Sequence, residues 1–195
     1  MLKCQIIKTI KLEFNWHKVY YESDEDIEFQ GYDKIKIIYA EKESYTATII
    51  EIDEDENGKF IVLSPRYRDD IHPGNCELQL IFSPRKSIKE SYKVISVYEY
   101  WPSFHDDEIE EVKLDSSGIS MIIKMNTVPD SKEKYKVVLK FFGIKQMEFQ
   151  DWWSSNIVLG IEFSYNGDFI QATIDASLGL VGSIVCEKVS VDFIE

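Results

Sequence analysis

The feature that most constrains the fold is a repeated alternation of apolar and polar residues along short stretches of the chain. At its start, the even positions are mainly apolar: Leu2, Cys4, Ile6, Ile10, Leu12, Phe14 and Trp16. The odd positions between them are mostly polar. A period of two is that of a β-strand with one buried face, so we predict one long strand over residues 2–16. No long stretch shows helical periodicity, which excludes a Rossmann fold or another parallel α/β architecture.

Four further strand-like runs follow, each short and rich in β-branched or aromatic residues: 35–39, 45–52, 60–63 and 78–82. The acidic stretch YESDEDIEF, residues 21–29, is predicted to be a loop. Asn57-Gly58 between two of the runs is typical of a tight hairpin turn, because both residues tolerate positive φ. Residues 1–85 are therefore predicted to form an antiparallel unit, either a small barrel or a sandwich.

A polar segment with a proline, SPRKSIKES at residues 83–91, is the predicted boundary between two units. The apolar positions of the next stretch, residues 92–101, fit either a short helix or a strand. If a helix forms there, Pro102 is expected to end it.

The strand pattern resumes after Pro102 and defines a second antiparallel unit over residues 92–195. Its turn-like connections include FFG at residues 141–143, which we expect to separate two strands. Regular spacing of this kind predicts a meander sheet with one buried face, in a protein that is mainly β with few short helices. The predicted strands are 109–114, 119–125, 135–141, 144–149, 157–165, 169–174 and 184–193.

Composition and charge narrow the classes of function. Apolar residues make up 44% of the chain and can fill a core, so the protein should be globular. Asp and Glu number 35 against 22 Lys and Arg, and the formal charge of −13 disfavours nucleic acid and anionic membranes as partners. A basic protein partner fits this charge better, although acidity for solubility alone explains it as well.

The three cysteines, Cys4, Cys76 and Cys186, are scattered and odd in number, so neither a disulfide framework nor a metal knuckle is predicted. Lysines interrupt the apolar residues of the first segment, which argues against a signal peptide. No apolar run is long enough for a membrane-spanning segment. We therefore expect reduced thiols and a cytoplasmic location.

Two stretches resemble metal sites only in part. Asp53, Asp55 and Asn57 match the first half of a calcium loop, but the position of the bidentate glutamate is Ser64, so an acidic hairpin tip is favoured. His72 lies four residues before Cys76, but the Pro-Gly between them favours a turn over a helical metal site. No metal and no cofactor is predicted.

The run WPSFHDDE, residues 101–108, admits two interpretations. An imidazole beside carboxylates suits acid–base chemistry or a divalent metal, so His105, Asp106 and Asp107 could form the centre of a metal-assisted hydrolase. In an extended segment, however, only His105 and Asp107 would share a face. The favoured interpretation is structural: Ser103 and Asp106 satisfy backbone groups where the chain enters the sheet, while Trp101, Phe104 and His105 form its scaffold. No catalytic residue is assigned.

Trp152 and Trp153 occur together in a loop-like stretch, QDWWSSN. Exposed tryptophans are common at the centre of protein interfaces, whereas buried ones close the open end of a sheet. We expect the pair to divide between these two roles.

Four stretches, YWPSFHDDEIEEVKL, VVLKFFGIKQMEF, SSNIVLGIEF and GLVGSIVCEKVSVDF, resemble the immunity protein 50 family over roughly residues 94–193. One departure is Asp107, where the family pattern suggests a small residue. The resemblance implies a non-enzymatic antidote encoded beside a bacterial polymorphic toxin, which binds and occludes that toxin. Partner contacts are then expected at Trp152, Trp153, Asp106 and Asp107. A stand-alone ligand-binding β module remains an alternative.

Overall fold

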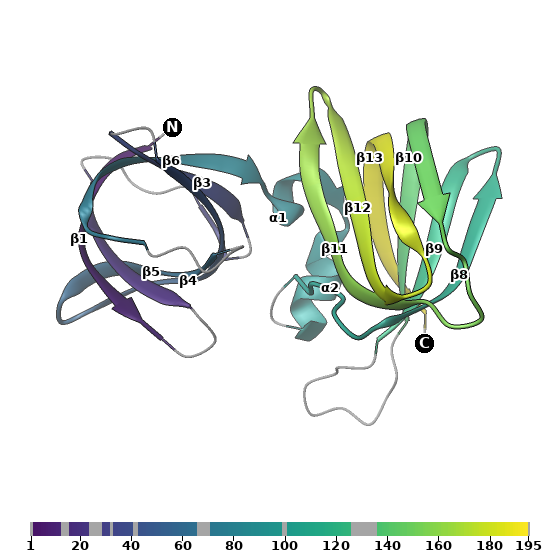
Figure 1. Cartoon of the computed structure of the whole chain (residues 1–195), viewed down its shortest axis with the longest axis horizontal. Helices are drawn as coiled ribbons and strands as arrows, with labels where there is room; N and C mark the ends of the chain where they lie inside the picture. Colours follow the sequence, from purple (N-terminus) through teal and green to yellow (C-terminus); the bar gives the residue numbers. More distant parts are fainter. Residues whose placement is uncertain are drawn as a thin grey trace. The chain divides into compact units, whose positions relative to one another are not determined.

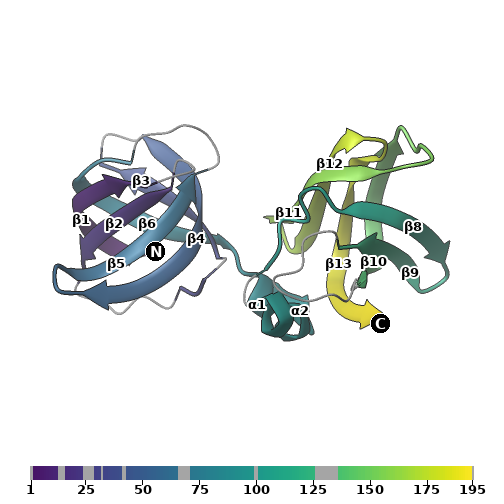
Figure 2. The ribbon, with the colours of Figure 1, turned by 90° about the horizontal axis from the view of Figure 1, so that it is seen from below.

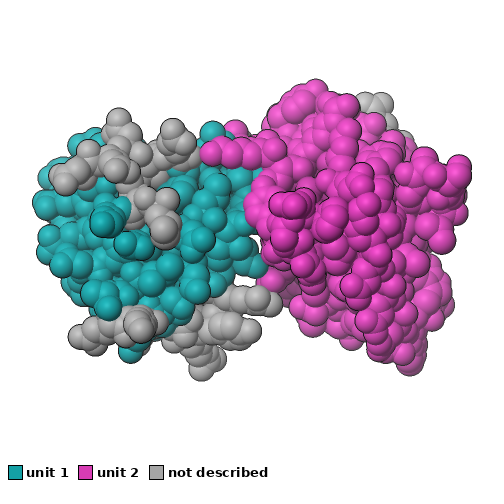
Figure 3. Space-filling view, turned by 90° about the horizontal axis from the view of Figure 1, so that it is seen from above, with its two compact units in different colours: residues 1–83 teal, residues 84–195 magenta. Residues whose placement is uncertain are grey.

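The computed structural model describes residues 2–12, 16–23, 29–31, 33–40, 43–65, 71–98, 101–125 and 136–194. The predicted fold class, mainly β with few short helices, is confirmed (Figure 1). The chain divides into two compact units, unit 1 over Met1–Ser83 and unit 2 over Pro84–Glu195 (Figure 3). The division falls inside the polar segment predicted as the boundary. No helix among the described residues has the length and apolar character to cross a membrane.

Unit 1 is a closed barrel of six strands (Figure 1). Of the two predicted architectures, barrel and sandwich, the structure shows the barrel. The order around the barrel is β1-β2-β5-β4-β3-β6, and β6 returns to pair with β1. β-Branched and large aliphatic side chains such as Ile35, Ile37 and Ile49 fill its interior. The strands are β1 (Leu2–Lys11), β2 (His17–Glu22), β3 (Lys34–Tyr39), β4 (Ser44–Asp55), β5 (Gly58–Pro65) and β6 (Gly74–Phe82).

The long first strand predicted over residues 2–16 is wrong in two respects. It ends at Lys11, and a separate strand, β2, begins at His17 within a stretch that we had not assigned to a strand. The prediction of a single buried face is also wrong, because a register shift between Ile6 and Lys8 breaks the alternation of buried and exposed side chains. Ile6 is buried, whereas Ile10 lies on the exposed side. Phe14 lies outside the described residues.

Unit 2 opens with three short elements, and the first two lie inside the polar segment that was predicted to be the boundary. They are α1 (Pro84–Ser87), β7 (Ile88–Lys89) and α2 (Ser91–Tyr98). The stretch whose period fitted either helix or strand is thus a helix in its described part. Its buried side chains Val94, Ile95 and Tyr98 recur at helical spacing and form one face.

Six strands of the sheet of unit 2 form two antiparallel meanders, β8-β9-β10 and β11-β12-β13 (Figures 1 and 2). The short strand β7 belongs to the same sheet and pairs in parallel with β13. β10 and β13 pair along nearly their whole lengths and join the meanders on one side. On the other side, one pair, Glu108 with Ile157, links β8 to β11. The strands are β8 (Glu108–Asp115), β9 (Gly118–Lys124), β10 (Lys136–Gln150), β11 (Ile157–Asn166), β12 (Phe169–Leu178) and β13 (Val181–Ile194).

The turn predicted at FFG is absent from the structure, because β10 continues through it as one strand. Gly143 takes a φ of 63°, and the register with β13 shifts between Ile144 and Gln146. The segment therefore holds a bulge, which a glycine at positive φ accommodates while pairing resumes on both sides.

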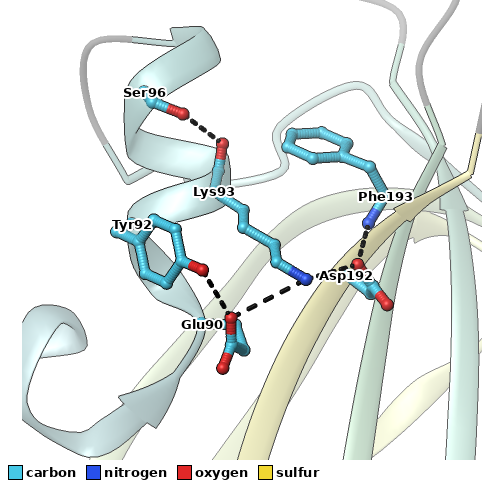
Figure 4. A network of polar contacts seen from close by, with 6 residues as sticks. All are labelled: Glu90, Tyr92, Lys93, Ser96, Asp192 and Phe193. Atoms are coloured by element: carbon cyan, nitrogen blue, oxygen red, sulfur yellow. Dashed lines mark hydrogen bonds and ion pairs between the residues drawn. The ribbon is translucent and has the colours of Figure 1, made fainter.

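Helix α2 packs against the C-terminal part of β13 (Figure 4). The rings of Tyr98 and Phe193 stack with their centroids 6.3 Å apart. The Lys93 ammonium lies 3.0 Å from an Asp192 carboxylate oxygen and 3.7 Å from that of Glu90. The hydrogen bond from Lys93 is the main cause that lowers the pKa of Asp192. Apolar and charged contacts thus anchor the helix to the sheet.

Candidate partner-binding surface

The segment Trp101–Asp107 continues the edge of β8 alongside β11. The Asp106 N–H donates to the Val158 carbonyl at 2.9 Å, and the Val158 N–H donates to the Asp107 carbonyl at 2.9 Å. Further along, the Ile161 N–H donates to the Ser103 carbonyl at 3.0 Å. These backbone bonds extend the contact between β8 and β11 beyond their single paired position, so the segment helps to close this side of the sheet.

An aromatic cluster lies beneath this segment. The Trp101 ring meets those of Phe104 and Phe163 edge-on, with centroids 5.9 Å away in each case. Trp101 and Phe104 are both buried. Phe104 has a φ of 63°, a left-handed conformation that is unfavourable for a side chain of this size. We infer that burial of its ring offsets this strain.

The structure separates the three residues of the proposed hydrolase centre. His105 and Asp106 are exposed, with His105 Nδ1 3.0 Å from an Asp106 carboxylate oxygen. Asp107 is only 1% exposed. The expected sharing of a face by His105 and Asp107 is therefore wrong, because a φ of 63° at Asp106 breaks the extended backbone on which it depended. The three side chains do not converge on one accessible point.

The burial of Asp107 also corrects its assignment as a partner contact. A side chain enclosed in the protein interior cannot reach a partner docked on the outside. The polar atoms of a buried carboxylate need partners within the protein. Of the acidic pair, Asp106 alone remains on the surface.

The partial calcium motif forms a hairpin tip. Asp55 pairs with Gly58, so the two-residue turn consists of Glu56 and Asn57, one position earlier than predicted. One Asp55 oxygen accepts from the Lys18 ammonium at 2.7 Å and the Tyr20 hydroxyl at 2.8 Å, and the other accepts from the Asn57 N–H at 2.8 Å. The Asp55 carboxylate thus binds side-chain and backbone donors of the barrel itself. The hydrogen bond from Lys18 is the main cause that lowers the pKa of Asp55.

The side chains of His72 and Cys76 have separate neighbours. The His72 ring stacks on Tyr39 with a centroid separation of 4.2 Å, whereas the Cys76 sulfur lies 3.4 Å from that of Cys4. Among the described residues, no group of three or more His, Cys, Asp or Glu side chains is placed so that it could hold a metal ion.

The two tryptophans lie in the connection between β10 and β11, and both are exposed. The exposed fractions are 53% for Trp152 and 58% for Trp153. Neither ring is buried at the end of the sheet, so the expected division into one buried and one exposed ring is wrong. Asp151 before them has a φ of 59°, which turns the chain sharply as it leaves β10.

Asn156 fixes this loop, and sequence reasoning did not identify it. Its side-chain oxygen accepts from the N–H groups of Trp153 at 3.1 Å and Leu180 at 3.0 Å. Its side-chain nitrogen donates to the Trp153 carbonyl at 3.0 Å. The Asn156 side chain is buried, and its backbone carbonyl accepts from the Ile109 N–H. The available signal was an asparagine at the end of a polar loop, where its side chain satisfies backbone groups.

Gly179 makes room for this arrangement in the turn between β12 and β13. A Cβ at this position would lie 2.3 Å from the Asn156 side-chain oxygen, and the φ of 89° also favours glycine. The loop with the tryptophans and the β12–β13 turn are therefore held together by one buried carboxamide.

More apolar side chains are exposed at the same end of the sheet. Leu178 ends β12 opposite Ile157, the first residue of β11, and Leu159 follows two residues later. Leu159 and Leu178 are both exposed. We call the exposed set Trp152, Trp153, Leu159 and Leu178 the tryptophan surface. The exposed pair His105 and Asp106 borders it, because Asp106 bonds to β11 at Val158.

The fold and this surface describe a mainly β protein that presents a fixed aromatic loop on one end of a sheet. Residues 90–195, more than half of the chain, match the model of a family described as Immunity protein 50. The chain belongs to this family of immunity proteins, and the resemblance seen over residues 94–193 is confirmed. Searches of curated proteins and of solved structures found no match.

Proposed function

We propose that this immunity protein binds and occludes a cognate bacterial toxin, and that it does so without catalysis. Membership of the family supports the class of function. The exposed and anchored tryptophan pair is the observation that carries the mode of action. The toxin belongs to a polymorphic toxin system, and the complex forms in the cytoplasm.

The tryptophan surface has the properties of an interface centre. Tryptophan is enriched among residues that dominate binding energy, because it buries a large area at a small cost in conformational entropy. Here the Asn156 carboxamide holds the Trp153 backbone from both sides, so the loop is ordered before the partner arrives. Preorganisation of this kind favours affinity, because less entropy is lost on association.

Charge supports a basic toxin and disfavours nucleic acid or a membrane as the partner. The acids number 17 through residue 85 and 18 after it, against 11 basic residues in each part, giving −6 and −7. Exposed acids of unit 2 include Asp106, whose N–H bonds to β11 at Val158, and Asp151, which directly precedes Trp152 in the chain. Such a field attracts a positively charged protein and accelerates its association.

The first experiment is co-expression with the product of the adjacent gene, scored by growth rescue and co-purification. Trp152→Ala and Trp153→Ala should each weaken the complex by about 30-fold or more, as expected for a hot-spot tryptophan. Leu114→Ala is the matched control, because Leu114 is also an exposed apolar residue but lies near the opposite end of β8. It should change affinity by less than about twofold.

Full protection and unchanged affinity in the double variant W152A/W153A would contradict the assigned surface. Failure of the wild-type protein to rescue growth or co-purify would contradict the function itself.

The electrostatic part is tested separately by the association rate. Raising the salt concentration should slow association and leave the dissociation rate nearly constant, because screening acts on the approach of the partners. An association rate independent of salt would refute steering.

A further inference from the structure

Two of the three cysteines face each other in unit 1, outside the surface described above. Cys4 on β1 is paired directly with Cys76 on β6, and their sulfur atoms lie 3.4 Å apart as free thiols. Directly opposed residues on antiparallel strands have Cα atoms about 4.5 or 5.5 Å apart. Both separations lie within the range of about 4.4–6.8 Å that a disulfide spans. The strand pairing itself thus suits a covalent link.

The pair lines a pocket that opens to solvent at one end of the barrel. The ends of β1, β2, β3 and β6 contribute to it, and its lining includes Lys3, Cys4, Gln5, Glu22, Tyr39 and Cys76. The cysteine side chains are 8% and 5% exposed, so they face both the barrel interior and this pocket. Because both cysteines line this pocket but are largely buried, we expect a small oxidant to reach the sulfur atoms more readily than a bulky protein thiol.

The two thiols are inequivalent. The hydrogen bond between them lowers the pKa of Cys4, against the opposing effect of burial, and raises the pKa of Cys76, with burial acting in the same direction. Cys4 is therefore the better candidate for the thiolate, which is the nucleophilic form. Cys186 on β13 is different: burial raises its pKa to about 11, and its sulfur donates to the Lys188 carbonyl.

We propose that Cys4 and Cys76 form a reversible disulfide site oxidised by small hydroperoxides. The Cys4 thiolate attacks one peroxide oxygen and the O–O bond breaks, which leaves a sulfenic acid on Cys4. With hydrogen peroxide, the departing hydroxide takes a proton and leaves as water. The Cys76 sulfur then attacks the Cys4 sulfur, the S–O bond breaks and a second water departs. Two thiols and one hydrogen peroxide thus give one disulfide and two waters.

The link would join the two strands whose pairing closes the barrel, between residues 72 positions apart in the chain. A cross-link that closes a long loop stabilises chiefly by restricting the unfolded chain. Oxidation should therefore raise the Tm of unit 1 by about 10 °C or more. The site would make the barrel more stable under oxidative conditions. This inference does not depend on the proposed toxin partner.

The test uses the full, reduced chain under native conditions with stoichiometric hydrogen peroxide. Alkylation after denaturation and non-reducing peptide mapping should show a bond between the Cys4 and Cys76 peptides, while Cys186 remains free. The intact mass should fall by two hydrogens, and dithiothreitol should reverse the change together with the rise in Tm.

Cys186→Ser is the control and should oxidise as the wild type does. Cys4→Ser and Cys76→Ser should each abolish the bond and the rise in Tm. The proposal fails if the native wild-type chain gives over-oxidised Cys4 beside reduced Cys76, if it links only between molecules, or if Cys186 reacts as fast. A disulfide that leaves the Tm unchanged would refute its role in closing the barrel.

Discussion

Replacement of Asn156 by alanine tests whether one buried carboxamide orders the tryptophan loop. The substitution removes three hydrogen bonds, two to Trp153 and one to Leu180. The Leu180 N–H is buried, and leaving such a donor unsatisfied costs about 1–3 kcal/mol. The partly buried groups of Trp153 can bond to water instead, so they contribute only about 0.5–1.5 kcal/mol each. We expect unit 2 to lose about 2–6 kcal/mol in total.

Urea unfolding followed by tryptophan fluorescence measures this loss. With a slope of about 1.5 kcal/mol per molar urea, the midpoint should fall by about 1.3–4 M with the slope unchanged. Hydrogen exchange should accelerate at the amide of Leu180, whose acceptor is gone. Asn166→Ala is the matched control, because Asn166 is exposed and bonds only to the Gln171 side chain among the contacts resolved. It should change stability by less than about 0.5 kcal/mol.

A loss below about 1 kcal/mol for Asn156→Ala, or unchanged exchange at Leu180, would refute the reasoning. It would mean that the strands on either side fix the loop and that the carboxamide is incidental. The same variant should weaken binding to the proposed toxin even though it leaves both tryptophans in place, because the loop would then have to become ordered on association and would lose entropy in doing so.

Two further predictions concern the barrel and the sheet. Lys18 lowers the pKa of Asp55 in the folded state, so the stability from this pair is present above the ordinary carboxyl pKa of about 4 and is lost as pH falls through the folded pKa. Asp55→Asn should therefore flatten the acid side of a plot of Tm against pH. Parallel curves for the variant and the wild type would contradict this. Gly182→Ala should destabilise unit 2 by about 1–3 kcal/mol in thermal unfolding, because its Cβ would lie 2.1 Å from the Glu148 carbonyl oxygen. Gly160→Ala is the control and should leave the stability nearly unchanged, because the nearest atom to its Cβ would lie 3.7 Å away.

The strand pattern was predictable where local alternation was regular. The run 157–165 corresponds to β11, Ile157–Asn166, and its predicted alternation holds at buried Ile161 and Phe163. Register shifts on either side of Val158 break the alternation there, so Val158 is buried and Leu159 is exposed. Prediction failed at β10, since a bulge with a glycine resembles a turn in sequence. What distinguishes the two is a long partner strand that pairs on both sides of the bulge, and local sequence does not contain that information.

The candidate surface was likewise predictable from the sequence only in part. The sequence predicted partner contacts at Trp152 and Trp153 from their chemistry and their polar surroundings, and the structure leaves both side chains exposed. The sequence also predicted partner contacts at Asp106 and Asp107, and it placed His105 and Asp107 on one face because an extended backbone was assumed for the segment after Phe104. The left-handed conformations at Phe104 and Asp106 depend on the contacts with β11 and on the aromatic cluster below. These contacts turn Asp107 inward and leave Asp106 outside.

The sequence by itself determined the fold class, the approximate strand positions and the family, because periodicity and motifs are properties of neighbouring residues. Only the tertiary structure decided which strands pair, which side chains of a turn are buried, and that Cys4 lies opposite Cys76. Strand register is set by hydrogen bonds between residues far apart in the chain, and a shift by one position moves every side chain to the other face. The tryptophan surface and the cysteine pair both follow from that register.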